Sequence, residues 1–270
     1  MYKLIALDMD GTLLTSDKRI SERTKQAIRA ARDKGVKVVL ASGRPFEGIQ
    51  SKLDELSITG DNEFVVSFNG SMVKELGSNK VIHQASITGL QTKRVAHLAK
   101  ELGLYCHAFS TELGLITPEN NEYTRIESDI NQIPTTEMNF DSISDGEKII
   151  KVMIVGEPEK LTAQIANIPQ AFKDEFTIVQ SAPFFLEFLS LDSNKGIGIQ
   201  SIAEYLGITA SEVICMGDAE NDHHMLQYAG LGIAMANAME ETTALADYIT
   251  DSNNDDGVAK AIEKFVLEAE

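Results

Sequence analysis

Short apolar runs alternate with helical segments from the start of this 270-residue chain. The apolar runs at residues 3–7, 36–42 and 63–70 are typical of buried strands. Residues 21–35 and 45–56 form the predicted helices between them, each with a suitable first residue in Ser or Pro. Such strands, apolar along almost their whole length, indicate a parallel sheet that is covered on both faces.

The C-terminal part repeats this pattern. Residues 194–207 and 221–230 are predicted helices, and residues 212–218 and 231–236 are predicted strands. Strands that alternate with helices favour an α/β class, a doubly wound parallel sheet of the Rossmann-like kind. The two ends of the chain are therefore expected to share one core.

The middle of the chain is different. Residues 84–190 combine helices with segments that look like antiparallel pairs, and the stretch between the segments "LGLIT" and "KIIKVMIVG" is predicted to be irregular. We interpret this part as an α+β domain inserted into the first one. The predicted division is a core domain of residues 1–83 plus 191–270 and an inserted domain of residues 84–190.

Charge and composition narrow the range of partners. The formal net charge is −17, so a nucleic-acid backbone or an anionic membrane is not expected as a partner. A small anionic substrate would need local cations, either basic side chains or a metal. The oligomeric state cannot be predicted from these features.

The cysteines and the N-terminal segment indicate the cellular compartment in which the protein is expected. Cys106 and Cys215 are the only cysteines, and we expect both to be reduced residues of the core. The first apolar run is too short for a signal peptide, and no run approaches the length of a membrane span. These features predict a cytoplasmic protein.

Polar and mostly acidic residues follow three of the predicted strands. In an open parallel sheet, the loops beyond the carboxyl ends of the strands form the ligand crevice. The residues are Asp8 and Asp10 after the first strand, Ser42, Gly43 and Arg44 after the second, and Asp218, Asn221 and Asp222 after a C-terminal one. Any one of these loops could be an ordinary turn. Three of them at one edge predict a site.

Several carboxylates at one edge require cations nearby. Two carboxylates about 4 Å apart repel each other by roughly 4 kcal/mol at an effective dielectric constant near 20. A hard divalent cation such as Mg²⁺ suits a set of oxygen ligands. The neighbours His223 and His224 are a weaker zinc candidate, because adjacent helical positions point about 100° apart. We interpret both histidines as surface residues.

A magnesium site beside a pair of aspartates suggests phosphoryl transfer. One carboxylate attacks phosphorus and forms an aspartyl-phosphate, while its neighbour moves protons. The Ser42 hydroxyl and the Gly43 amide can donate hydrogen bonds to the phosphoryl oxygens.

Four segments of the sequence resemble the motifs of the haloacid-dehalogenase (HAD) phosphatase superfamily. They are "DMDGTLL", "LASGRP", "SNKGIGIQ" and "MGDAENDHHML", in the order of that family. The long insertion between the second and third motifs is similar to that of the Cof-type members with a IIB cap. Within these, "NKG", "SAPFFLEFL" and "DGVAKAIEK" look close to the YidA sugar-phosphatase group.

The resemblance implies catalytic and metal-binding roles at four aspartates. Asp8 would be the nucleophile and a Mg²⁺ ligand. Asp10 would be the general acid and base, with its backbone carbonyl as a second ligand. Asp218 would be a further Mg²⁺ ligand, and Asp222 would orient the site from behind these ligands.

The resemblance also implies a set of phosphate contacts. The amides of Met9 and Gly43 and the hydroxyl of Ser42 would hold the phosphate. Lys195 would bind phosphate and shield the acidic cluster, and Asn221 would contact phosphate or a metal-bound water.

Other positions are weaker candidates. Arg44 could contact substrate, or it could cap a helix or pair with a group at a helix start. Asn69 could contact substrate from a turn at the end of a strand. In the inserted domain His107, Tyr123 and Glu187 are candidates for substrate contacts.

These expectations combine into one predicted function. The chain is predicted to be a Mg²⁺-dependent phosphatase that hydrolyses phosphate monoesters of small metabolites, above all sugar phosphates, through an aspartyl-phosphate. Pyridoxal phosphate and flavin mononucleotide are alternative substrates. A phosphomutase and a non-catalytic phosphosugar sensor are less favoured alternatives.

Overall fold

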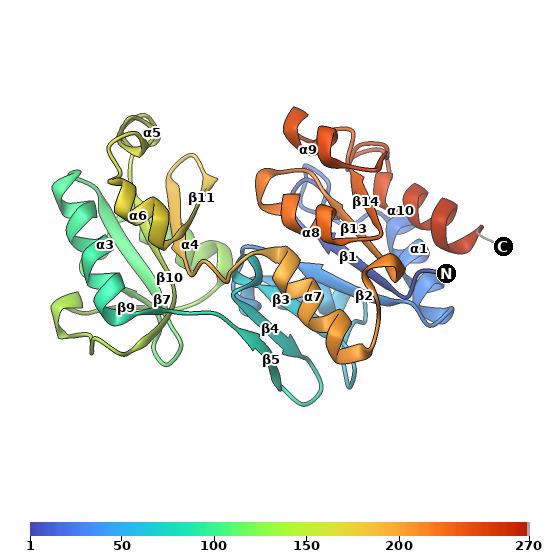
Figure 1. The fold of residues 1–270 in the computed structure, drawn as a ribbon, viewed down its shortest axis with the longest axis horizontal. Helices are drawn as coiled ribbons and strands as arrows, with labels where there is room; N and C mark the ends of the chain where they lie inside the picture. Colours follow the sequence, from blue (N-terminus) through green and yellow to red (C-terminus); the bar gives the residue numbers. More distant parts are fainter. Residues whose placement is uncertain (269–270) are drawn as a thin grey trace. The chain divides into compact units, whose positions relative to one another are not determined.

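The computed structural model describes residues 1–268 and divides the chain into two compact units. The core unit contains Met1–Gln84 and Asn194–Glu270, and the inserted unit contains Ala85–Ser193. Figure 1 shows that the first and last segments of the chain, blue and orange to red, build the core unit together.

An eight-stranded sheet forms the centre of the core unit. Its strands are β1 Leu4–Asp8, β2 Lys37–Ala41, β3 Phe64–Ser67, β4 Met72–Glu75, β5 Val81–Gln84, β13 Val213–Gly217, β14 Leu231–Ala234 and β15 Tyr248–Ile249. Their order in the sheet is β15-β14-β13-β1-β2-β3-β4-β5. The strands from β15 to β3 are parallel, and β4 and β5 add an antiparallel hairpin at one edge.

Helices cover both faces of this sheet. They are α1 Glu22–Asp33, α2 Phe46–Glu55, α7 Lys195–Leu206, α8 His223–Tyr228, α9 Glu240–Leu245 and α10 Gly257–Ile262. Ile5 and Leu7 of β1 pack in a cluster that includes buried residues of α1, α2 and α10. Leu4 and Ala6 pack on the opposite face with buried residues of α7 and α8. The predicted doubly wound α/β core is confirmed.

The inserted unit is an α+β unit built on a seven-stranded sheet. Its strands are β6 Ile87–Thr88, β7 Tyr105–Ser110, β8 Gly114–Thr117, β9 Thr135–Glu137, β10 Lys148–Val155, β11 Thr177–Ala182 and β12 Phe185–Leu189. Its helices are α3 Gly89–Glu101, α4 Glu122–Asn131, α5 Pro158–Ile165 and α6 Gln170–Glu175. The order β11-β12-β10-β7-β8-β9 is antiparallel except between β8 and β9.

Helix α4 corrects the sequence prediction, which treated this stretch as irregular. The Asn121 side chain caps the helix by accepting hydrogen bonds from the amides of Tyr123 and Thr124. Gln132, in a left-handed conformation, ends it. The helix has mostly polar residues, so its buried face did not stand out in the sequence.

The two cysteines are unpaired and buried, as predicted. Cys106 lies on β7 of the inserted unit and Cys215 on β13 of the core. Burial raises the pKa of the Cys106 thiol to about 12, so this side chain behaves as a small apolar residue. Within residues 1–268, every helix is too short or too polar to span a bilayer.

Candidate active site

The carboxyl ends of three neighbouring parallel strands bring the predicted residues together. Asp8 is the last residue of β1 and stands opposite Ala41 of β2 in the sheet register. On the other side of β1, Leu7 stands opposite Met216 of β13. The loops that begin after these strands therefore start at one edge of the core sheet.

A tight turn follows β1 and approaches the loop after β13. The amides of Leu13 and Leu14 donate to the carbonyl oxygens of Asp8 and Met9, at 3.1 and 2.8 Å. Gly11 has φ of +91°, and a Cβ added there would lie 2.3 Å from Asp218 Oδ2. Only glycine therefore lets this turn pass so close to the Asp218 carboxylate.

Lys195 is the cation at the centre of the site. Its side chain is completely buried, and its Nζ donates to Asp8 Oδ1 at 2.5 Å and to Asp222 Oδ1 at 2.6 Å. Asn194 caps helix α7 by accepting from the Ile197 amide, which fixes Lys195 as the first helical residue. The structure thus joins Asp8 to a lysine 187 residues away in the sequence.

Asp222 is held from two sides. Its Oδ1 accepts from Lys195, and its Oδ2 accepts from the amides of Asp218 and Ala219 at 2.9 and 3.1 Å. It is fully buried, and Gly217 leaves the space for it, since a Cβ there would lie 2.4 Å from the Asp222 Cβ. Both oxygens of Asp222 are occupied, which suits a residue that positions its neighbours.

The donor set fits a hard divalent cation. Carboxylate oxygens of Asp8, Asp218 and Asp222 lie within 4.8 Å of one another. Oxygen-only donors favour a cation such as Mg²⁺ over zinc. Because Asp222 already accepts three N–H hydrogen bonds, Asp8 and Asp218 are the carboxylates best able to hold such an ion. The carboxylate of Asp10 is not part of this cluster.

Burial is the largest influence on the protonation of the cluster. It raises the pKa of Asp8 well above its usual value, and Lys195 opposes this rise. Burial also raises the pKa of Asp218 to about 6, while the Thr12 hydroxyl, 2.8 Å from Asp218 Oδ1, favours the charged form. In the absence of a cation, the carboxyl groups of the folded site therefore bind protons more tightly than usual. A bound metal ion would displace these protons.

The contribution of Asp218 to the stability of the metal-free protein is expected to fall as the pH rises from about 4 to about 6. The pKa of folded Asp218, about 6, lies above its usual value of 3.8, so the folded state binds this proton more tightly. The part of the free energy of unfolding that Asp218 contributes falls through that window and stays low above it. Added Mg²⁺ should therefore raise the Tm more near pH 8 than near pH 5.

Thermal unfolding with and without Mg²⁺, at matched ionic strength, measures this effect. The variant Asp218→Asn should lose both this part of the pH dependence and most of the Mg²⁺ shift. Equal Mg²⁺ shifts at the two pH values would contradict the prediction.

Asp10 has an environment that the sequence did not predict. Arg44 donates from Nε to Asp10 Oδ2 at 2.9 Å and from Nη2 to Asp10 Oδ1 at 2.8 Å. Lys18, which sequence reasoning missed, donates to Oδ1 at 2.7 Å. Burial alone would raise the pKa of Asp10, but the two cations hold it below its usual value. The Arg44 guanidinium pairs with Asp10 in the loop after β1, a partner that was not predicted from the sequence.

The predicted phosphate contacts lie around the same edge. Met9 follows β1, with its side chain packed in the core, so only its backbone can face a ligand. Ser42 is buried, and its hydroxyl accepts from the Arg44 amide at 3.2 Å. Asn221 donates from Nδ2 to Asn69 Oδ1 at 3.0 Å. Asn221 is therefore held by another side chain rather than left to rotate.

Asn69 lies in a strained turn that meets two of these loops. It has φ of +53°, follows Phe68 at +51°, and is only 3% exposed. Its amide donates to the Ser42 carbonyl at 2.9 Å, and a Cβ on Gly43 would lie 3.0 Å from its Nδ2. Asn69 therefore connects the loop after β2 to Asn221. The left-handed backbone conformation at Phe68 is unfavourable for a bulky residue, so it persists only because the surrounding structure holds it.

Two substitutions of Asn69 should separate the free-energy cost of its left-handed backbone conformation from the loss of its side-chain hydrogen bond. Both Asn69→Ala and Asn69→Gly lose the bond from Asn221. Glycine accepts the left-handed backbone freely, so the glycine variant should be more stable than the alanine variant by about 1 kcal/mol. Urea unfolding measures the difference, and an alanine variant of equal or greater stability would contradict it.

The candidates of the inserted unit are mostly buried. His107 is fully buried between Thr124 Oγ1 at 3.1 Å and Met153 Sδ at 3.2 Å. Burial lowers its pKa to about 3, so it is neutral. Glu187 is 2% exposed and accepts from Lys151 Nζ at 2.9 Å. These contacts lie within the unit's own fold.

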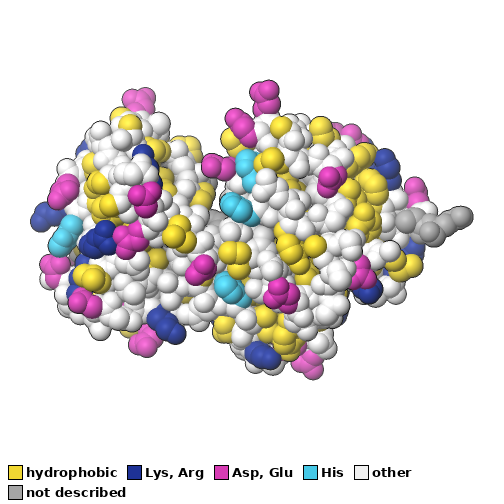
Figure 2. All heavy atoms as spheres, viewed as in Figure 1, with side chains coloured by type: hydrophobic (Ala, Val, Ile, Leu, Met, Phe, Trp, Pro, Cys, Tyr) yellow, Lys and Arg dark blue, Asp and Glu magenta, His cyan; other side chains and the backbone are white. Residues whose placement is uncertain are grey.

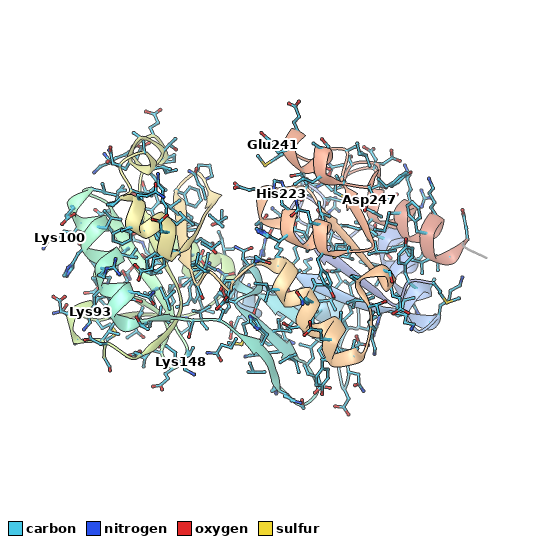
Figure 3. The ribbon with its side chains drawn as sticks, viewed as in Figure 1. Lys93, Lys100, Lys148, His223, Glu241 and Asp247 are labelled. Atoms are coloured by element: carbon cyan, nitrogen blue, oxygen red, sulfur yellow. The ribbon has the colours of Figure 1, made fainter. Side chains whose placement is uncertain are left out.

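The histidine pair of α8 does not form a metal site within the described residues. His223 Nε2 is 2.9 Å from the Thr242 hydroxyl of α9. Figure 3 shows His223 near α9, the helix that carries Glu241. His224, its neighbour, is exposed. The prediction that both histidines are surface residues is correct for His224, whereas His223 is partly buried against α9.

The fold and the site define a class: a doubly wound α/β core that carries a buried Asp–Lys–Asp cluster at the carboxyl edge of its sheet. Comparison with known proteins gives the family. Residues 5–262 match the model of the haloacid dehalogenase-like hydrolases, and the chain belongs to this family.

Several relatives of this chain are named as phosphatases. It is 40% identical to "putative phosphatase YxeH" of Bacillus subtilis over 99% of both chains. It is 33% identical to 5-amino-6-(5-phospho-D-ribitylamino)uracil phosphatase YcsE of the same species, covering 98% of this chain and 96% of YcsE. Among solved structures, the HAD subclass IIB sugar phosphatase BT4131 superposes with a TM-score of 0.81 and 29% identity, covering 97% and 98% of the two chains. The predicted Cof-type, subclass IIB relationship is thereby confirmed.

Proposed function

We propose that this hydrolase is a Mg²⁺-dependent phosphatase of small phosphate monoesters, most of all sugar phosphates. The observation that carries the proposal is the buried contact of Asp8 with Lys195, beside Asp218, at the carboxyl edge of the core sheet. A carboxylate next to a fixed cation can attack a phosphoryl group without repelling it.

The first step transfers the phosphoryl group to Asp8. A carboxylate oxygen of Asp8 bonds to phosphorus while the bond from phosphorus to the ester oxygen breaks. Asp10 gives a proton to the departing oxygen, so an alcohol leaves. In the second step water attacks the aspartyl-phosphate, Asp10 takes a proton from it, and orthophosphate and free Asp8 result.

Other residues hold the phosphoryl oxygens during both steps. The Ser42 hydroxyl, the backbone amides of Met9 and Gly43, the Lys195 ammonium and the Asn221 amide are the proposed donors. Asp8, Asp218 and the carbonyl of Asp10 would hold Mg²⁺. The ion supplies positive charge to the transferring group.

Two relatives guide the choice of substrate. BT4131 is named a sugar phosphatase, which supports sugar phosphates as the first class to test. YcsE is named for a ribityl phosphate carried on a pyrimidine, which keeps other small phosphometabolites, such as pyridoxal phosphate and flavin mononucleotide, as the alternative. A non-catalytic sensor is less favoured, since every residue that the hydrolytic steps require is present. A mutase would use the same residues, and the assay below separates it from a phosphatase.

The proposed partners are small molecules in a reducing compartment. Two buried, unpaired thiols suit the cytoplasm. On the face shown in Figure 2, basic side chains are scattered among acidic ones, and the net charge is −17. This distribution does not favour nucleic acid or an anionic membrane as a partner.

Release of orthophosphate tests the function directly. The full chain would be assayed with Mg²⁺ against a panel of phosphorylated sugars, cofactors and nucleotides, with a chelator as the control. Hydrolysis of sugar phosphates with the highest kcat/KM supports the proposal. Phosphoryl transfer between sugar positions without net release indicates a mutase, and binding without either reaction indicates a sensor.

A further inference from the structure

Asn237, in the loop after β14, joins two parts of the core unit through its side-chain amide. Its Nδ2 donates to the Gly11 carbonyl at 2.8 Å, and its Oδ1 accepts from the Asn253 amide at 2.9 Å. The side chain of Asn253 in turn donates from Nδ2 to the Leu14 carbonyl at 2.8 Å. Two asparagines from the C-terminal part of the chain therefore hold the turn that follows β1.

Gly11 is the residue of this turn at which such a bond matters most. Glycine has the widest choice of backbone conformations, so the chain itself restrains its carbonyl the least. Asp10 precedes Gly11, and its carbonyl is a proposed Mg²⁺ ligand. Thr12 follows Gly11, and its hydroxyl donates to Asp218 Oδ1 at 2.8 Å. A rotation of the Gly11 backbone would move both of these groups, and the hydrogen bond from Asn237 opposes it.

The segment that carries Asn237 also reaches the loop after β13. The Met239 amide donates to the Asp218 carbonyl at 2.9 Å. Asp218 is one of the two carboxylates best able to hold the ion. Residues 237–239 are therefore bonded to both of the loops that contribute proposed Mg²⁺ ligands, the one after β1 and the one after β13.

We propose that Asn237 is a positioning residue for the Mg²⁺ site, an inference that rests on the proposed phosphatase function. It contributes no ligand atom and acts through the backbone. Its hydrogen bond holds Gly11, and Gly11 holds the Asp10 carbonyl and the Thr12 hydroxyl in place. A turn that is already ordered loses less conformational entropy when the ion binds, so the affinity for Mg²⁺ is higher.

Three Asn→Ala variants of the full chain, at positions 237, 253 and 254, test this role. Asn254 is the matched control, because it holds the same loop farther from Gly11: its Oδ1 accepts from the Ser16 amide and its Nδ2 donates to the Ser16 hydroxyl, both at 2.9 Å. All three asparagines have a negative φ, so alanine fits each backbone. The rise of the Tm with Mg²⁺ concentration, at constant ionic strength, gives the Kd for Mg²⁺ alone. The Tm without Mg²⁺ gives the loss of stability.

Asn237→Ala is expected to weaken Mg²⁺ binding about 5- to 10-fold, Asn253→Ala about 2- to 3-fold, and Asn254→Ala by less than about 1.5-fold. Without Mg²⁺, Asn254→Ala should lower the Tm about as much as Asn237→Ala, because each removes two side-chain hydrogen bonds. The loss of affinity should therefore follow the distance from Gly11 and not the loss of stability.

Two results would overturn the proposal. One is an unchanged or higher affinity for Mg²⁺ in Asn237→Ala, and the other is an equal loss of affinity in Asn254→Ala. A wild-type chain whose Tm does not respond to Mg²⁺ would instead refute the metal dependence of the proposed function, and the inference with it.

Phosphate release gives a second readout. The Mg²⁺ concentration that supports half of the maximal rate should rise in Asn237→Ala by the same factor as the Kd. A variant that was merely less stable would lose the same fraction of its rate at every Mg²⁺ concentration, and that result would contradict a positioning role. A wild-type chain that binds Mg²⁺ but releases no phosphate would refute the proposed function, whereas the series of Kd values would still decide the role of Asn237.

Discussion

An Asp8→Asn enzyme is expected to lose turnover by roughly 10⁴-fold or more while it keeps its fold. Asp8 ends β1 and lies 6% exposed against Lys195 Nζ. An amide oxygen at this position has the size of the carboxylate but is a much poorer nucleophile. Substrate binding should stay largely intact, because the proposed phosphate donors on the other loops are unchanged.

Two measurements separate this role from a structural one. Orthophosphate release gives the turnover, and a mass spectrum of acid-quenched wild-type enzyme should carry a phosphoryl group on the peptide of Asp8. The peptide of the variant should carry none. Asp33→Asn, at an exposed position of α1, is the matched control and should be active. Wild-type turnover in Asp8→Asn would end the assignment of Asp8 as nucleophile.

Strand ends made most of this site predictable. The apolar run before Asp8 fixed the end of β1, and the same logic located Ser42 and Asp218 after their strands. In a parallel sheet these ends share one edge, so clustering follows from topology alone. The position of Lys195 could not be predicted from strand ends. A lysine at the start of a helix is common, and only the motif around Lys195 marked it as a site residue.

The features of the site that the sequence did not predict depend on contacts between loops. Nothing in the sequence spacing joins Lys18 to Asp10, because the link runs through a left-handed turn and an exposed side chain. Arg44 was a candidate for substrate or pairing, and only the fold shows its guanidinium on Asp10. Asn69 holds Asn221 through a strained turn whose backbone angles no residue pattern specifies.

Lys195→Met is expected to abolish activity and to reduce stability by about 3–5 kcal/mol, the usual cost of breaking a buried ion pair from one side. The ammonium is fully buried between Asp8 and Asp222. Burial alone would lower the pKa of Lys195, but these two carboxylates raise it above its usual value, so the lysine is charged at neutral pH. Removing it leaves two buried carboxylates that face each other uncompensated.

The stability of the Lys195→Met variant should depend on pH with a defined sign. Burial and neighbouring carboxylates raise the pKa of Asp8, and Lys195 opposes them. Without Lys195 that pKa rises further, so the folded variant binds a proton that the unfolded chain releases. The loss of stability should therefore be smaller near pH 5 than near pH 8.

A second substitution distinguishes repulsion from a simple cavity. Lys195→Met combined with Asp222→Asn removes one of the two facing charges, so it should recover part of the stability but none of the activity. Urea unfolding at the two pH values measures the first quantity, and phosphate release measures the second. Lys100→Met, at an exposed position of α3 (Figure 3), controls for the loss of one charge and should leave both unchanged. If the double variant were no more stable than Lys195→Met at either pH, charge repulsion would not be the cause, and the role of Lys195 as the neutralising cation of the site would fail.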